Sequence, residues 1–199
     1  DAYEFKHEGD SKIKLKDEKI LKLFFEGNGQ ELYGLSSLGR IILLRSATNR
    51  QTPAPVFKNQ AGAKVFWNRN LSTFLINKGK QFQYSRLNGK APPPPVFMER
   101  AVTGVGMEES RFEVLAGLDN GKVVAMDQDL KTKKWTLQVS AKPITSVQYH
   151  PKDHYLFAGD AAGWVHIYDM KKKKFIFQKK IHTAAAEARI LVNAQGKPD

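Results

Sequence analysis

Apolar and polar residues alternate along most of this chain in short runs, the two-residue period of half-buried β-strands. Glycines punctuate these runs: Gly39, Gly79, Gly121 and Gly163 follow one another at distances of 40, 42 and 42 residues. One apolar run precedes each glycine and another follows it, which predicts a β-hairpin that turns at the glycine. Four hairpins at nearly the same spacing indicate an internal repeat.

A further β-like run lies before and after each hairpin, so each unit holds four short strands, named a to d. The runs before the hairpins cover residues 20–25, 63–67, 102–106 and 144–149, and those after them cover 55–58, 95–98, 135–139 and 175–178. Four strands at a period near 42 residues are typical of a β-propeller blade. An irregular β-sandwich also contains many short strands, but it would not repeat a glycine-marked hairpin four times at this spacing.

We therefore predict one all-β propeller domain of about four complete four-stranded antiparallel blades with flanking strands. Residues 20–58, 59–99, 100–140 and 141–182 form blades 1 to 4, residues 1–19 hold strand d, with or without strand c, of a preceding or composite blade, and residues 183–199 hold the first strand of a further blade. The best helical candidate is the Ala-rich stretch 183–191, of which we expect the second half to pair as a strand. Since both ends stop in mid-blade, we expect a piece of a longer chain. A five-bladed ring would require the two ends to complete one blade.

The fourth unit, residues 143–169, resembles a WD40 repeat. Its first strand ends in His150-Pro151, its second ends in the small pair Ala158-Gly159, and a hairpin glycine follows at Gly163. Tyr168-Asp169 stands where that family has its Trp-Asp dipeptide. The resemblance implies a propeller that serves as a platform for interactions with other proteins.

The other units follow this pattern less closely. Unit three has Met126-Asp127 at the dipeptide position, but the hairpins of units one and two end in Leu44-Arg45 and Tyr84-Ser85. Ala162 occupies the usual position of the turn aspartate in unit four. We therefore expect that the hydrogen-bonded His–Ser/Thr–Asp–Trp set of the family is not assembled in any unit.

Candidate chemistry is sparse. The chain has no cysteine, which excludes disulfides, thiolate zinc sites, iron–sulfur clusters and cysteine nucleophiles. His150 and His154 have the spacing of a helical metal site, but Pro151 between them predicts a turn. Glu108 and Glu109 are expected to be solvated in another turn. We predict no catalytic residue, no cofactor and no metal, and hence no enzyme; a propeller enzyme would need site residues from outside this segment.

Turns and packing account for most of the remaining notable residues. The stretch Pro92–Pro95 leads into a predicted strand, so we interpret it as a rigid loop rather than as a polyproline II ligand. Four aspartates are expected to cap hairpin backbone: Asp119, Asp127, Asp160 and Asp169. Four large aromatic residues are expected to pack between blades: Trp67, Trp135, Trp164 and Tyr168.

Basic residues are the most informative feature of the composition. The chain has 32 Lys+Arg against 20 Asp+Glu, a net charge of +12. Many of them fall in the loops between strands c and d, which open on one face because rotation relates the blades. The predicted basic rim consists of Arg45, Arg50, Arg86, Lys90, Lys131, Lys133, Lys134, Lys171, Lys172, Lys173 and Lys174. Lys179 and Lys180 lie at the other end of strand d and should project elsewhere.

The basic rim has two interpretations. It either keeps the surface solvated, or it docks on an acidic protein or a phosphate backbone. Because aromatic residues are not interleaved with these lysines, any contact with RNA should be to the backbone and sensitive to salt.

Together these features predict a non-catalytic WD40-like scaffold that mediates protein–protein interactions within a larger complex. The alternative is an RNA-binding or ribonucleoprotein component. We expect no membrane span, because no run of about 18 apolar residues occurs. The lack of cysteine fits an intracellular location in the cytoplasm or nucleus, and a basic mature mitochondrial protein would have the same composition.

Overall fold

The strands of this chain form antiparallel meanders in which neighbours along the sequence are also neighbours in the sheet. In the computed structural model, residues 4–5, 13–14, 19–25, 31–38, 41–46, 55–57, 63–68, 73–86, 94–108, 113–150, 152 and 154–184 are described. Their regular elements are all strands, grouped into four four-stranded sheets and one two-stranded sheet. The prediction of an all-β chain with about four propeller blades is therefore confirmed. Within these ranges there is also no helix of the length and hydropathy that crossing a bilayer requires.

Each four-stranded sheet is one blade, and its strands a to d follow chain order. Blade 1 contains β3 (Ile20–Phe25), β4 (Glu31–Ser36), β5 (Ile41–Ser46) and β6 (Pro55–Phe57); blade 2 contains β7 (Lys64–Asn68), β8 (Thr73–Lys78), β9 (Gln81–Arg86) and β10 (Val96–Phe97). Blade 3 contains β11 (Val102–Glu108), β12 (Glu113–Leu118), β13 (Lys122–Asp127) and β14 (Lys133–Gln138); blade 4 contains β15 (Ile144–His150), β16 (Tyr155–Asp160), β17 (Trp164–Asp169) and β18 (Lys174–Lys180). Ahead of them, β1 (Glu4–Phe5) pairs with β2 (Ile13–Lys14). Residues 185–199, the larger part of the predicted further strand, lie outside the described residues.

The chain divides into two compact units, and each is described by itself. The first comprises Asp1–Lys78 and Gln83–Pro94. Its core is centred on Phe74, which is fully buried and meets the ring of Phe24 edge-on at 5.5 Å. Buried apolar residues of blades 1 and 2 surround this ring: Phe24, Tyr33, Ile41, Val65 and Ile76.

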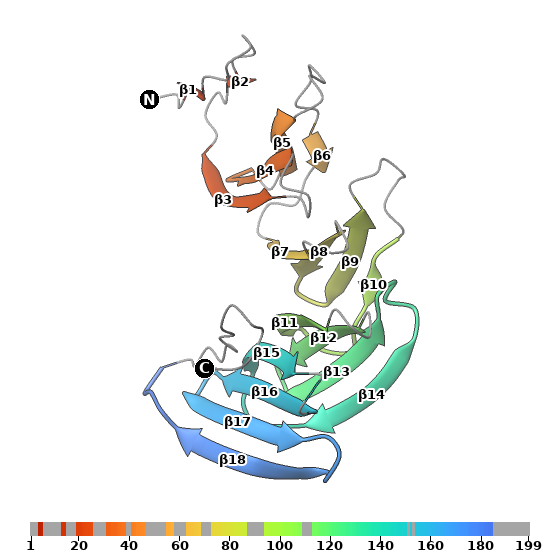
Figure 1. The fold of residues 1–199 in the computed structure, drawn as a ribbon, viewed down its shortest axis with the longest axis vertical. Coiled ribbons are helices and arrows are strands. Elements are labelled where there is room, and N and C mark those ends of the chain that lie inside the picture. The colour runs from red at the N-terminus through yellow and green to blue at the C-terminus, as the bar shows by residue number, and fades with distance from the viewer. Residues whose placement is uncertain are drawn as a thin grey trace. The chain divides into compact units, whose positions relative to one another are not determined.

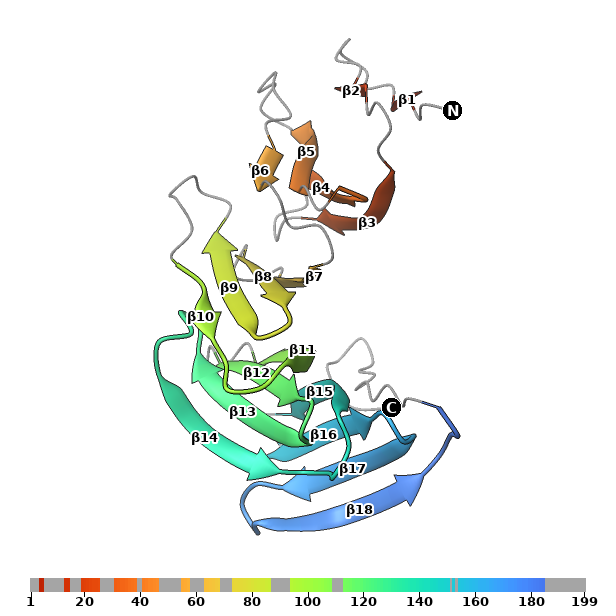
Figure 2. The same ribbon diagram turned by 180° about the vertical axis from the view of Figure 1, so that it is seen from behind.

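The second unit comprises Gly79–Phe82 and Pro95–Asp199, and in it blades 3 and 4 pack face to face. Their first strands, β11 and β15, lie side by side (Figures 1 and 2). Gly104 and Gly106 make this possible, because a Cβ atom at Gly106 would overlap the carbonyl oxygen of Val147. The Thr103 hydroxyl also donates a hydrogen bond to the Ile144 carbonyl at 2.6 Å.

The hairpin glycines at the 42-residue spacing have the predicted turn role. Gly79, Gly121 and Gly163 have φ values of 62°, 78° and 84°, in the region that glycine adopts without steric cost. The carbonyl of Gly121 accepts hydrogen bonds from the two residues that follow β14, and the carbonyl of Gly163 does the same after β18. Gly39 lies outside the described residues.

The structure differs from the prediction at Glu108 and agrees with it at the proline stretch before β10. The expectation that Glu108 is solvated is wrong: it is 3% exposed, because β11 continues through Glu108 instead of ending at Gly106. Glu109 is not among the described residues. The segment after Pro95 does enter an edge strand, β10, as the rigid-loop interpretation requires.

Candidate interaction site

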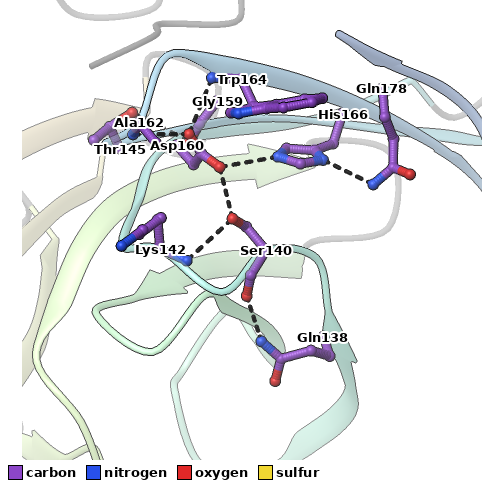
Figure 3. A network of polar contacts seen from close by, with 10 residues as sticks. All are labelled: Gln138, Ser140, Lys142, Thr145, Gly159, Asp160, Ala162, Trp164, His166 and Gln178. Carbon is purple, nitrogen blue, oxygen red and sulfur yellow. Dashed lines mark hydrogen bonds and ion pairs between the residues drawn. The ribbon is translucent and has the colours of Figure 1, made fainter. Parts of the chain in front are cut away.

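A buried carboxylate closes the turn between β16 and β17 in blade 4 (Figure 3). Asp160, the last residue of β16, is 1% exposed. Its Oδ1 atom accepts hydrogen bonds from the backbone N–H groups of Ala162 at 2.9 Å and Trp164 at 3.0 Å. Its Oδ2 atom accepts one from the Ser140 hydroxyl at 2.6 Å and lies 3.1 Å from His166 Nε2. The carboxylate therefore ties the turn to strand c of its own blade and to the connection from blade 3.

The polar chain continues on both sides of Asp160 (Figure 3). On β18, the Gln178 amide nitrogen lies 3.1 Å from His166 Nδ1. On β14, the Gln138 amide nitrogen donates to the carbonyl of Ser140 at 2.5 Å. We call the set Gln138, Ser140, Asp160, His166 and Gln178 the polar column.

Hydrogen bonding controls the charge state of the Asp160 carboxyl. Burial by itself raises the pKa of the Asp160 carboxyl, but the hydrogen bonds from Ser140, Trp164, His166 and Ala162 outweigh it. The pKa of Asp160 therefore lies below its usual value of 3.8, and the group is an anion at neutral pH. A buried anion with four donors is a structural anchor rather than a proton carrier.

Sequence reasoning missed this column. It looked for the turn aspartate at position 162, whereas the carboxylate comes from Asp160 at the end of the strand. The network at this end of blade 4 is a chain of different residues from the family set, and in it Asp160 also has the hairpin-capping role predicted for it. Asp160 and His166 are six residues apart across one hairpin, a spacing that could have signalled the contact. The Ser140 and Gln178 partners depend on tertiary structure.

The predicted aromatic packing residues divide into two groups. Trp135 and Tyr168 pack against the apolar cluster between blades 3 and 4, as predicted. Trp164 does not pack in this apolar cluster: it is the first residue of β17 and is 38% exposed. Its ring stacks beside His166 with 6.4 Å between ring centroids and 20° between planes. The side chain of Trp67 is not described.

Trp164 and the polar column line a groove between blades 3 and 4. The groove has a volume of about 720 Å³. Its walls come from the end of β14, the connection to β15, and the two outer strands of blade 4. Besides the polar column it is lined by Val139, Ala141, Lys142, Ala162 and Trp164.

The predicted basic rim is described at two of its four loops. The β13–β14 connection carries Lys131, and β14 begins with Lys133 and Lys134. The β17–β18 turn and the start of β18 carry Lys171, Lys172, Lys173 and Lys174. All these side chains are exposed, and both connections lie on the same side of the unit (Figures 1 and 2). Arg50 and Lys90 lie outside the described residues, as do the side chains of Arg45 and Arg86, so a four-loop rim stays a prediction.

Aspartates fix the backbone of both lysine-bearing connections. Asp169 accepts hydrogen bonds from the N–H groups of Lys172 at 2.8 Å and Lys171 at 3.0 Å, and these bonds lower its pKa. Asp127 accepts from Lys131 at 2.7 Å and from Thr132 at 3.1 Å. Burial alone would raise the pKa of Asp127, but its hydrogen bonds lower it. The capping role predicted for Asp127 and Asp169 is observed. It is not observed for Asp119, whose carboxylate pairs with Arg100 at 2.8 Å, while Asn120 Oδ1 accepts the bond from the Lys122 N–H in that turn.

Few of these lysines have a carboxylate partner. Lys134 pairs with Glu113 at 3.2 Å and Lys172 with Asp169 at 3.6 Å. Within the described ranges, the other lysines of these two connections form no ion pair. Their charge is therefore available to an anionic surface.

The two histidines at metal-site spacing lie on strand and turn. His150 ends β15, and His154 follows in the turn with φ of 57°. The Tyr149 hydroxyl lies 3.2 Å from His154 Nδ1. No group of three His, Asp or Glu side chains suited to a metal ion occurs in the part of the chain that the structure describes.

Comparison with known proteins supports the fold and leaves the family open. No protein-family profile and no curated protein matches this chain. Among solved structures, 1314 chains match, so the fold is widely used. One is a chain in a crystal structure of the mitotic checkpoint complex, with a TM-score of 0.64 and 14% sequence identity over 82% of this chain and 52% of that chain. This chain thus spans about half the length of that one, and the likeness at this identity concerns the fold alone.

Proposed function

We propose that this chain is a non-catalytic, WD40-like β-propeller scaffold that mediates protein–protein interactions within a larger complex. The observation that carries the proposal is the use made of its perturbed carboxylates. Asp127, Asp160 and Asp169 all have lowered pKa values, and each accepts hydrogen bonds from backbone N–H groups of a turn. Perturbed carboxylates in enzymes face a reacting group, whereas these hold loops in place.

Rigid loops on a sheet framework are what a recognition platform needs, because a pre-organised surface loses little entropy on binding. The mitotic checkpoint chain that this fold resembles is itself part of a multi-protein assembly, which supports protein partners. The lack of cysteine supports an intracellular setting for such a complex.

The test is purification of the tagged full-length chain from its own cells, followed by cross-linking and mass spectrometry. Each purification is split and one half is treated with nuclease. We expect the same proteins at constant ratio in both halves, with cross-links to blades 3 and 4. If the chain elutes alone, or if every partner is lost after nuclease, the scaffold proposal is wrong.

RNA binding is the second candidate, and the exposed lysines on the two neighbouring c–d connections favour it. Lys131, Lys133, Lys171, Lys173 and Lys174 project from backbone that aspartates hold in place. A surface of this kind contacts phosphates without reading sequence, and the affinity then falls steeply with salt. Loss of all partners after nuclease would favour this candidate.

A further inference from the structure

The groove beside the polar column has a counterpart one repeat earlier. A smaller groove of about 280 Å³ lies between β10 and the outer strands of blade 3. Its lining positions correspond to those of the larger groove after a shift of 42 residues. The polar column at Gln138, Ser140, Asp160, His166 and Gln178 replaces Val96, Met98, Leu118, Val124 and Thr136.

The fold thus builds the same kind of groove from two different sets of side chains. Apolar residues at Met98, Leu118 and Val124 show that packing at these positions does not require polar groups. Asp160 and His166 are the buried members of the polar column, and buried polar groups add little net stability over a well-packed apolar core. This buried polar pair at blade 4 therefore calls for a reason other than stability.

Two residues of the polar column that line the groove, Gln138 and Gln178, have unused hydrogen-bond acceptors. The amide nitrogens of Gln138 and Gln178 are engaged within the protein (Figure 3). Their amide oxygens have no donor among the described residues. One acceptor lies on β14 and the other on β18, and such acceptors suit the N–H groups of an extended peptide.

The exposed charge around the groove is positive. Lys142 lines it, and Lys180 lies directly opposite Trp164 on β18, so the two share a face of the sheet. Among the described lining residues Asp160 is the one carboxylate, and its oxygens are shielded by four donors. An acidic ligand is therefore complementary and a basic one is repelled.

We propose that the groove between blades 3 and 4 binds a short extended segment of a protein partner that carries an acidic side chain beside an apolar one. The apolar side chain packs on Trp164, the carboxylate pairs with Lys142, and the peptide N–H groups donate to Gln138 and Gln178. The proposal rests on the scaffold function and specifies the chemistry of one of its partners. A nucleic-acid strand fits less well, because a stacking platform uses aromatic residues for successive bases, whereas the described lining of the groove holds one indole ring, that of Trp164.

The experiment uses the full-length chain and an array of fluorescent octapeptides in four classes. The classes are acidic with apolar residues, acidic with glycine only, basic with apolar residues, and neutral with apolar residues. An oligouridine 10-mer is the fifth probe. Binding is measured by fluorescence anisotropy at about 100 mM salt, where long-range attraction is largely screened. We expect the acidic–apolar class to bind with Kd below about 1 mM and at least tenfold more tightly than the other classes.

Matched variants place the binding in this groove. Trp164→Ala should weaken the acidic–apolar peptides at least tenfold, and Lys142→Glu at least fivefold. The controls are Phe97→Ala and Lys122→Glu, which remove an exposed apolar residue and a lysine from the equivalent groove at blade 3. They should change the affinity less than twofold. Each variant is checked for an unchanged urea midpoint.

Three results would overturn the proposal: no preference for the acidic–apolar class, equal losses in the controls, or oligouridine binding that depends on Trp164 when peptide binding does not. The scaffold function fails separately, when purification yields no nuclease-resistant partner. If the Trp164→Ala variant retains every nuclease-resistant protein partner in this purification, the groove proposal is wrong and the scaffold function stands.

Discussion

Removing the carboxylate of Asp160 tests how much the polar column contributes to stability. Asp160→Ala leaves the Ser140 hydroxyl, His166 Nε2 and two backbone N–H groups without their acceptor in a site that is 1% exposed. A hydrogen bond to a charged group contributes about 1.5–3 kcal/mol, but the four bonds share one site and do not add. The loss of one partner from a buried charged network costs about 3–5 kcal/mol, and we expect this decrease in the free energy of unfolding.

Urea unfolding followed by tryptophan fluorescence measures the effect. In a Trp67→Phe background the remaining tryptophans, Trp135 and Trp164, both report on the second unit. With a urea slope of about 3 kcal/mol per molar, the midpoint should fall by about 1–2 M at unchanged slope. If the midpoint shifts by an amount that corresponds to less than about 0.5 kcal/mol of destabilisation, the view that Asp160 anchors the turn is refuted.

A matched variant separates the loss of one partner from the loss of polarity. It carries the residues found 42 positions earlier: Ser140→Met, Asp160→Leu, His166→Val and Gln178→Thr. The Ser140 hydroxyl and the His166 ring are then removed together with their acceptor, and only backbone N–H groups, those of Lys142, Ala162 and Trp164, lose a partner. We therefore expect part of the stability lost in Asp160→Ala to return. A quadruple variant less stable than the single one would show that the two grooves are not equivalent.

Acid, the hairpin glycines and the lysine turns give three further predictions. Folding lowers the pKa of Asp160, so its carboxylate stabilises the folded state fully above about pH 4, and this stabilisation is lost as the pH falls through the lowered pKa. Between pH 6 and pH 2 the urea midpoint should therefore drop less for Asp160→Asn than for the unmodified chain. Gly79→Ala should cost about 1–2 kcal/mol, because its φ is positive but its surroundings are open. Gly121→Ala should cost at least twice as much, because its Cβ would overlap a backbone carbonyl; equal urea midpoints would contradict this. If the chain binds RNA, replacement of Lys171–Lys174 by Glu should abolish binding of a single-stranded RNA 20-mer, and the control Lys78→Glu should not. If the unmodified chain binds no RNA at about 100 mM salt, the RNA alternative is ruled out.

Hairpins and blades could be predicted from the sequence because their causes are local. A glycine with positive φ between two alternating runs is a steric requirement that the sequence displays directly, as at Gly121 and Gly163. Capping aspartates such as Asp169 are equally local, since their donors lie two and three residues away. The position of Lys171–Lys174 between two predicted strands was also local information, because it depended only on the order of strands c and d along the sequence.

Contacts that join blades could not be predicted in this way. The polar column needs Gln178 opposite His166, and a bulge between Ile167 and Tyr168 separates this register from that of the residues next to the β17–β18 turn. It also needs Ser140 from the preceding connection. From its position in the repeat Trp164 is predicted to pack between blades, but in the structure it is the first residue of β17 and is partly exposed.

The bare backbone contact at Gly104 and Gly106 has a consequence for cooperativity. In a repeat protein, stability is the sum of the contribution of each repeat and of each interface between neighbours. The equivalent positions in blade 4 are Ser146 and Gln148, where side chains replace the bare backbone. The interface between blades 3 and 4 should therefore open last, and amide hydrogens of β12 and β16 should exchange together and more slowly than those of the outer strands β14 and β18.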